Sequence, residues 1–269
     1  MKLSKFLNRR NLFISDKRQR FIFQTVFLTV CLLVTQLIWE DYRFIMVGII
    51  FISSYILTAW SLSEDLKGIK WISLFILPVL FTATISLFYF LLPARWIIRL
   101  LIITTFALGT YASLLVENIY NVAVLRSIQL LRVAQSVGLL ITLIILFFSC
   151  SIILSLRAYG GQNMLYLIPV TFLLALQSLW SVELEETFSK RIIFYSLLVS
   201  LGVGELVMAI SFWPIQIASA SLFITACFYT LIGIIQQHLF GRLFRNTVRE
   251  YILVFIFTLF LIFLTTKWG

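Results

Sequence analysis

The sequence predicts an all-α integral membrane protein, a polytopic bundle of about nine transmembrane helices with the N-terminus in the cytoplasm and the C-terminus outside. First, 61% of the 269 residues are hydrophobic and only 12% are charged, whereas soluble proteins have about 45–50% apolar and about 25% charged residues. Second, apolar runs of about 18 or more residues, long enough to cross a hydrocarbon core, recur along nearly the whole chain. Third, connections that are rich in Lys and Arg alternate along the chain with connections that hold few of them.

The first apolar run follows a basic segment, residues 1–20, which holds seven Lys and Arg. This arrangement is similar to the start of a signal peptide. However, the run at 21–39 is about 19 residues long and ends in Glu40 and Asp41 rather than in a small-residue cleavage site. We therefore expect a cytoplasmic segment at 1–20 and a single bundle over 21–269, with the first span retained.

The later runs are separated by short connections, which predicts a compact bundle. Pro78 and Pro169 fall inside two of the runs, where each removes a backbone donor, and we expect kinks there. The predicted spans are 21–39, 44–62, 71–92, 96–116, 133–156, 164–182, 192–211, 215–235 and 251–266.

Basic residues near the span ends orient the bundle, because short cytoplasmic loops carry an excess of Lys and Arg. With a cytoplasmic N-terminus, sixteen lie on the inner side and four on the outer side. The inner ones are those of segment 1–20 with Lys67, Lys70, Arg126, Arg132, Lys190, Arg191, Arg242, Arg245 and Arg249, and the outer ones are Arg43, Arg95, Arg157 and Lys267.

The tryptophans support the same boundaries, since the indole ring favours the membrane–water interface. All seven lie at or near predicted span ends: Trp39, Trp60, Trp71, Trp96, Trp180, Trp213 and Trp268. We therefore expect a multi-pass protein of a bacterial-type inner membrane, in contact with the anionic headgroups of the inner leaflet. The net charge of +10 is explained by orientation, so nucleic acid is not an expected partner, whereas a protein partner or an oligomer stays open.

Ionisable groups inside a membrane are costly and therefore mark candidate sites. Two are predicted in the outer half of the bilayer, Arg99 in the fourth span and Glu205 in the seventh. They could form an ion pair that fixes two helices, with Arg99 otherwise extending toward the outer surface. The alternative is an outward-facing substrate or proton site, in which Gly202 and Gly204 allow close helix approach.

A denser set of polar residues is predicted on the inner side. The candidate residues there are Glu117, Asn118, Asn121, Arg132, Gln177, Glu183, Glu185, Glu186 and His238. Much of the stretch 117–132 has its polar residues on one helical face, so it is either an amphipathic helix in the inner interface or a continuation of the neighbouring spans. The polar residues either face headgroups and water or line a cavity open to the cytoplasm.

Residues 185–190, Glu-Glu-Thr-Phe-Ser-Lys, resemble the Glu-Glu-x-x-x-Arg motif of the CAAX-protease-like intramembrane family. The resemblance implies that Glu185 and Glu186 activate water and that histidines on later helices take part. In this chain Lys190 replaces the arginine of the motif, and His238 is the single histidine. Ile234 stands where the family has a phenylalanine.

Motifs for other chemistries are absent. One histidine leaves no usual histidine-based metal site, and no nucleophile elbow or phosphate-binding glycine-rich loop occurs. We expect no cofactor and no metal, and no residue is assigned a catalytic role. The favoured function is a non-catalytic structural or assembly subunit. The alternatives are a secondary transporter that uses Glu205, Arg99 and the inner polar groups, and an enzyme that acts at the inner leaflet on lipid or as an intramembrane protease.

Overall fold

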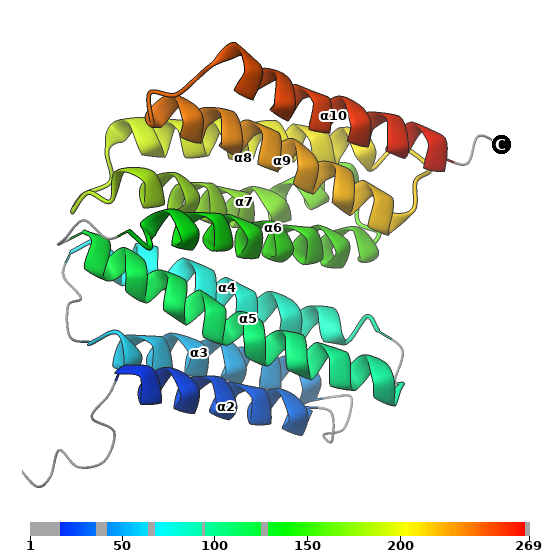
Figure 1. The fold of residues 1–269 in the computed structure, drawn as a ribbon. Helices are drawn as coiled ribbons and strands as arrows, with labels where there is room; N and C mark the ends of the chain where they lie inside the picture. Colours follow the sequence, from blue (N-terminus) through cyan, green and yellow to red (C-terminus); the bar gives the residue numbers. More distant parts are fainter. Residues whose placement is uncertain (1–16, 36–41, 64–67, 93–94, 125–128, 267–269) are drawn as a thin grey trace, which may run out of the picture.

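In a computed structural model the chain is a bundle of long, nearly parallel and antiparallel helices (Figure 1). The structure describes residues 17–35, 42–63, 68–92, 95–124 and 129–266. Most of segment 1–20, together with Trp39, Arg126 and Trp268, lies outside the described residues, and so does the side chain of Arg43. The helices are α2 (Lys17–Thr35), α3 (Arg43–Ser61), α4 (Lys70–Tyr89), α5 (Trp96–Ala123), α6 (Leu131–Ser155), α7 (Gly160–Glu183), α8 (Lys190–Ile210), α9 (Ile217–Leu239) and α10 (Arg245–Thr265).

The predicted all-α polytopic bundle is confirmed. Eight of these helices, α3 to α10, are long and apolar enough to cross a membrane. Helix α2 is described only to Thr35, short of the predicted end of its span. The largest difference from the predicted spans is in α5, which continues seven residues past position 116 to Ala123. The polar residues of that stretch end the apolar run but do not end the helix, and two of them, Glu117 and Asn121, bond to other helices of the bundle.

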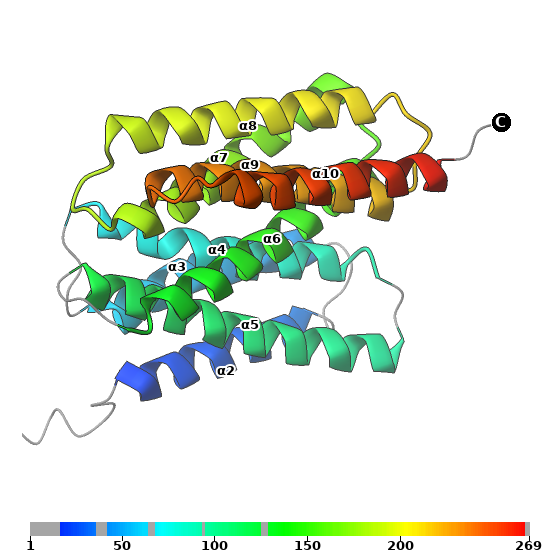
Figure 2. The same ribbon diagram turned by 45° about the horizontal axis from the view of Figure 1, so that its top comes forward.

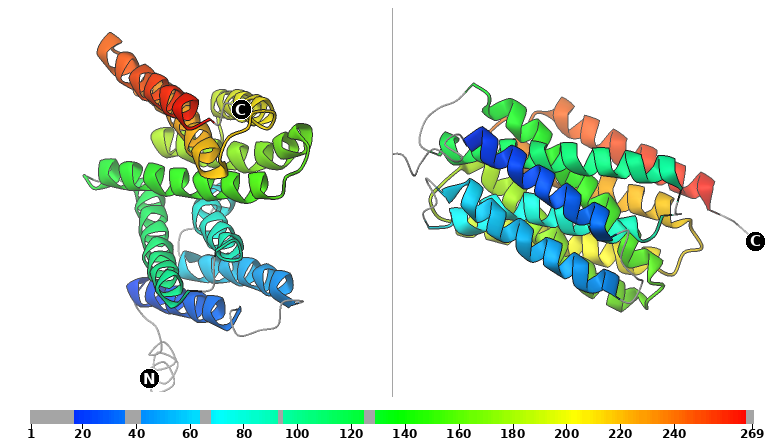
Figure 3. Two further views of the ribbon diagram at one scale, coloured as in Figure 1. Left: turned by 90° about the vertical axis from the view of Figure 1, so that its right-hand side faces the viewer. Right: turned by 90° about the horizontal axis from the view of Figure 1, so that it is seen from below.

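Consecutive helices pack on one another throughout, and five further contacts between non-consecutive described helices close the bundle. Helix α5 returns to α2, so that α2 to α5 form a closed group, and α6 packs on α4, α5, α7 and α9. Helix α7 also reaches α4 and α9. Figures 1 and 2 show α6 between the α2–α5 group and the helices α7 to α10. Helix α10 lies at the margin, beside α9 (Figure 3, left), and α9 is its one substantial neighbour among the described helices.

Hydrogen bonds between polar side chains join several helix pairs inside the apolar bundle. Gln24 of α2 donates to Thr58 Oγ1 of α3 at 2.8 Å and accepts from Ser61 Oγ at 2.8 Å. Thr84 and Ser149 join α4 to α6, and Ser151 and Ser221 join α6 to α9. Such bonds stabilise helix association in lipid, where apolar contact alone gives little preference.

Replacing Gln24 by alanine is expected to lower the free energy of unfolding by about 1–2 kcal/mol, because two interhelical hydrogen bonds are lost. The measurement is thermal or denaturant unfolding in detergent. Gln19→Ala is the matched control, since Gln19 lies on the same helix and is exposed. Equal stability of the two variants would contradict the structural role of Gln24.

The two glycines of α8 differ in their packing. A Cβ at Gly204 would approach Ile168 Cγ1 of α7 to 2.8 Å, whereas a Cβ at Gly202 would meet nothing within 4 Å. Close helix approach therefore depends on Gly204 and not on Gly202.

We call the end of the bundle where α4, α6, α8 and α10 begin the basic end. It carries the described residues Lys17, Arg18, Arg20, Lys70, Arg132, Lys190, Arg191, Arg242, Arg245 and Arg249, whereas Arg95, Arg99 and Arg157 lie toward the opposite end.

Candidate functional site

Glu117 is the central residue of a buried polar cluster near the basic end. It lies in the last two turns of α5 and is completely buried. Its Oε1 accepts a hydrogen bond of 2.8 Å from Nε2 of Gln177 in α7. Its Oε2 is buried and has no hydrogen-bond partner. Because an incompletely satisfied carboxyl group is costly inside protein and membrane, Glu117 is the strongest functional candidate among the predicted residues.

Asn121 extends the cluster one helical turn beyond Glu117, on the same face of α5. Lys70, the first residue of α4, donates from Nζ to Asn121 Oδ1 at 2.9 Å and to its backbone oxygen at 3.3 Å. Lys70 is only 6% exposed. The structure thus binds a lysine to α5 one helical turn from the residue that carries the buried carboxyl group. Sequence reasoning counted Lys70 only as a charge near a loop, although its place directly before a predicted span was a usable signal.

Two aromatic residues close the cluster on the side of the α7–α8 connection. Tyr120 donates to the backbone oxygen of Ala134 in α6 at 3.0 Å, and its ring packs edge-on against Trp180 of α7. Both side chains are fully buried. Trp180 therefore differs from an interfacial tryptophan: it lies at a span end as predicted, but its ring is enclosed by protein.

The backbone turn at the end of α7 explains why the indole N–H of Trp180 bonds to Glu185. Leu184 adopts a left-handed backbone conformation, with φ 51°, and its N–H bonds to the oxygen of Trp180. This turn ends α7 and directs the chain back, so that Trp180 Nε1 donates to the Glu185 backbone oxygen at 3.0 Å. This bond joins the α7–α8 connection to the aromatic side of the cluster.

Helix α7 also links the cluster to α6 and α9. Gln135 of α6 donates to the Ser181 backbone oxygen at 2.7 Å, and Gln236 of α9 donates to Ser178 at 3.0 Å. With Gln177, these bonds hold three helices against one turn of α7. The arrangement is that of a structural junction.

The remaining acidic candidates do not join Glu117. Glu183 accepts from Ser189 Oγ at 3.1 Å, and Glu185 and Glu186 are exposed in the α7–α8 connection. His238 lies exposed in α9, where its Nε2 is 2.9 Å from the guanidinium of Arg191. The structure therefore does not bring Glu117, Glu185 and His238 together into one acid–base constellation.

The other two candidates of the inner set lie beside these groups. Asn118 follows Glu117 in α5, and its Oδ1 is buried without a partner. Arg132 is exposed at the start of α6. Of the stretch 117–132, residues 117–123 continue α5 and residues 131 and 132 begin α6, while residues 125–128 lie outside the described residues.

The ion pair that Arg99 and Glu205 could form is not present among the described residues. Arg99 lies over the ring of Trp96 in its own helix, at 5.5 Å, and its Nε is buried without a partner. Glu205 is exposed on α8, and α5 and α8 are not in substantial contact. The prediction used only depth along each helix, which does not determine which helices are neighbours.

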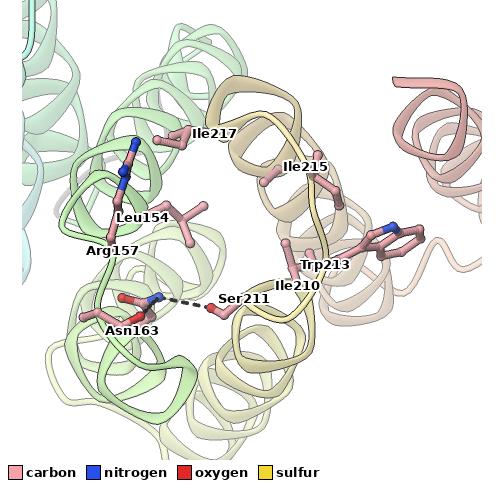
Figure 4. A pocket seen from close by; sticks show the side chains of 10 residues that line it. Leu154, Arg157, Asn163, Ile210, Ser211, Trp213, Ile215 and Ile217 are labelled. Atoms are coloured by element: carbon pink, nitrogen blue, oxygen red, sulfur yellow. Dashed lines mark hydrogen bonds between the residues drawn. The ribbon is translucent and has the colours of Figure 1, made fainter. Parts of the chain in front are cut away.

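A cavity of about 360 Å³ lies at the opposite end instead, between α6, α7, α8 and α9. Figure 4 shows Arg157, Asn163, Ser211 and Trp213 around it. Asn163 Nδ2 donates to Ser211 Oγ at 3.1 Å and to the Ala158 backbone oxygen at 3.2 Å. Sequence reasoning missed this cavity. The sequence feature that could have indicated the cavity is the position of Arg157 and Asn163 on either side of Gly160 and Gly161, where α7 begins.

The chain belongs to a family of proteins of unknown function (DUF5656), whose model matches residues 53–265. The match covers the buried polar cluster and the helices α4 to α10. No curated protein and no solved structure matches the chain.

Proposed function

We propose that the chain is a non-catalytic structural or assembly subunit of a bacterial-type inner membrane. The observation that supports this proposal is that the buried polar groups bond to one another across helices. Glu117 accepts a hydrogen bond from Gln177, and Lys70 donates one to Asn121. None of the four described cavities is lined by Glu117, Glu205 or His238. Acid–base catalysis requires such groups to face a space that a substrate can enter.

The proposed orientation places the basic end in the cytoplasm. It rests on the excess of Lys and Arg in short cytoplasmic loops of membrane proteins. Ten described basic residues lie at that end, and Arg95, Arg99 and Arg157 lie toward the opposite end. The anionic headgroups of the inner leaflet would then face the larger charge.

An assembly role also fits the outer surface of the bundle. Helix α10 has only Thr258 and Ile262 buried, and large apolar side chains such as Phe257, Phe260 and Leu264 are about 58–62% exposed. In a membrane this surface contacts either lipid or another transmembrane helix.

The test is the mass of the native particle. After mild extraction from native membranes, the chain is expected in a complex larger than itself and one lipid annulus, and Glu117→Gln is expected to leave that complex unchanged. The measurement is native electrophoresis with quantitative proteomics, with exposed Glu185→Gln as control. A wild-type chain found only as a lipid-bound monomer contradicts the proposal.

One observation favours a second candidate function, a secondary transporter. The Oε2 atom of Glu117 is fully buried without a hydrogen-bond partner, one turn from the residue that binds Lys70. An exchangeable proton on such a group is a common device of ion-coupled carriers. If Glu117→Gln folds normally but abolishes a proton-coupled solute flux in vesicles, this function replaces the first.

A further inference from the structure

One groove between α6, α9 and α10 contains two cavities in succession. The cavity nearer the basic end has a volume of about 370 Å³, and residues such as Arg132, Gln135, Gln236, Gln237 and Arg242 line it. The next cavity, of about 470 Å³, is lined almost entirely by apolar side chains of the same three helices.

The two cavities follow each other along the helix axes. On α6, Leu139 lines the first cavity and Leu143, one turn further, lines the second. On α10, Tyr251 lines the first and Val254 the second. The polar part of the groove therefore lies at the end of the bundle and the apolar part lies toward its middle.

The polar cavity is positively charged, as an anion-binding site is. Arg132 and Arg242 reach it from two different elements, and no acidic residue lines it. Neither guanidinium has a hydrogen bond or ion pair with any described residue. Arginine presents a planar fork of donors that matches phosphate oxygens, so two arginines on one cavity favour a phosphate group.

Gln135 and Gln236 give this cavity a fixed wall. Their amide nitrogens are bonded to Ser181 and Ser178 of α7, which holds both side chains in place. Their positions are thus determined by the buried junction and not by the ligand. The polar cavity is built before any ligand arrives.

The apolar cavity has the shape and chemistry of an acyl-chain site. Its walls include Phe147 and Phe148 of α6, Leu222 of α9 and Phe257 of α10. The ring of Phe257 is 61% exposed, at the edge of the groove that faces the bilayer. A hydrocarbon chain that enters sideways from the bilayer would complete the packing that α10 leaves open.

We propose that this groove binds one anionic glycerophospholipid, with its phosphate between Arg132 and Arg242 and one acyl chain along α6, α9 and α10. Basic cavities between transmembrane helices are the usual sites for acidic lipid headgroups. A transmembrane helix from a second copy would fill the apolar cavity but would leave both arginines without an anion. The polarity of the groove, charged at the membrane surface and apolar inside, is that of a lipid in one leaflet.

The experiment measures lipid retention by the purified, delipidated full-length chain, using native mass spectrometry with added dioleoyl phosphatidylglycerol or dioleoyl phosphatidylcholine. We expect the wild-type chain to prefer phosphatidylglycerol. The double variant Arg132→Gln with Arg242→Gln should lower that binding about 10- to 30-fold. The matched control is Arg245→Gln with Arg249→Gln, which removes the same charge at the same end but touches neither cavity.

A second variant tests the acyl-chain part. Ala226→Trp places an indole in the apolar cavity and should reduce phosphatidylglycerol binding, whereas Ala209→Trp on exposed α8 surface should not. Thermal unfolding of each variant identifies loss of fold. If Ala226→Trp does not fold, lipid binding by the Arg132→Gln, Arg242→Gln double variant decides the question. Equal loss in the Arg245/Arg249 control, equal binding of phosphatidylcholine, competition by glycerol phosphate alone, or dimerisation through the groove would overturn the proposal.

Discussion

Replacing Glu117 by alanine is expected to lower the free energy of unfolding by about 2–4 kcal/mol, because the substitution leaves Gln177 Nε2 buried without an acceptor and opens a cavity. Glu117→Gln retains an oxygen acceptor and nearly the same volume, so we expect a change below about 1 kcal/mol. The measurement is unfolding in detergent or nanodiscs followed by tryptophan fluorescence, to which buried Trp180 contributes.

The matched control is Glu185→Ala, because Glu185 is exposed in the α7–α8 connection. A change below about 0.5 kcal/mol is expected there. A double-mutant cycle of Glu117→Ala with Gln177→Ala should give a coupling energy of about 0.5–3 kcal/mol. If Glu117→Gln is as unstable as Glu117→Ala, or if the cycle shows no coupling, the hydrogen bond between the two residues does not have the role assigned to it.

Gly109→Ala is expected to destabilise the bundle by about 1–3 kcal/mol through overpacking. Gly109 of α5 faces the ring of Phe81 in α4, and an added Cβ would overlap that ring. Phe81 is 1% exposed and stacks on Phe106, so it cannot move without disturbing the core between α4 and α5. Alanine has the higher helix propensity by up to about 1 kcal/mol, which makes a net loss a clear sign of the contact.

The control for this prediction is Gly48→Ala in α3, where an added Cβ meets nothing within 4 Å. That variant should be neutral or more stable. Combining Gly109→Ala with Phe81→Leu should recover part of the loss, since leucine has no ring at the position of overlap. Additive losses in the double variant would show that the ring is not the cause.

The sequence predicted the helices well because span length and apolar composition are local properties. The end of α5 was left open between an interfacial helix and a continued span, because Glu117 and Asn121 are polar. Whether a polar side chain is satisfied depends on distant residues such as Gln177 and Lys70. The ion pair between Arg99 and Glu205 does not form, for a related reason. Hydropathy and charge give the depth of a residue along its helix but not the face or the neighbour of that helix.

The candidate site was predicted in part. Glu117, Asn121 and Gln177 were all singled out, and the structure brings Glu117 to Gln177 and Asn121 to Lys70. The paired glutamates 185 and 186 stay apart from them because both are exposed in the α7–α8 connection, and His238 is exposed on α9. The groove of α6, α9 and α10 requires three helices that are not all consecutive, and no local pattern marks it.

The order in which helices contact one another has a consequence for biosynthesis. Each substantial contact joins helices at most three apart in the chain, from α2 with α5 to α6 with α9. As the ribosome delivers the spans one by one, α5 completes the first closed group, and each later helix finds its partners already inserted. Among the described helices, α10 is the last in the chain, and α9 is its one substantial neighbour. The helices can therefore pack in the order of their synthesis, because few of their contacts are made with helices far along the chain.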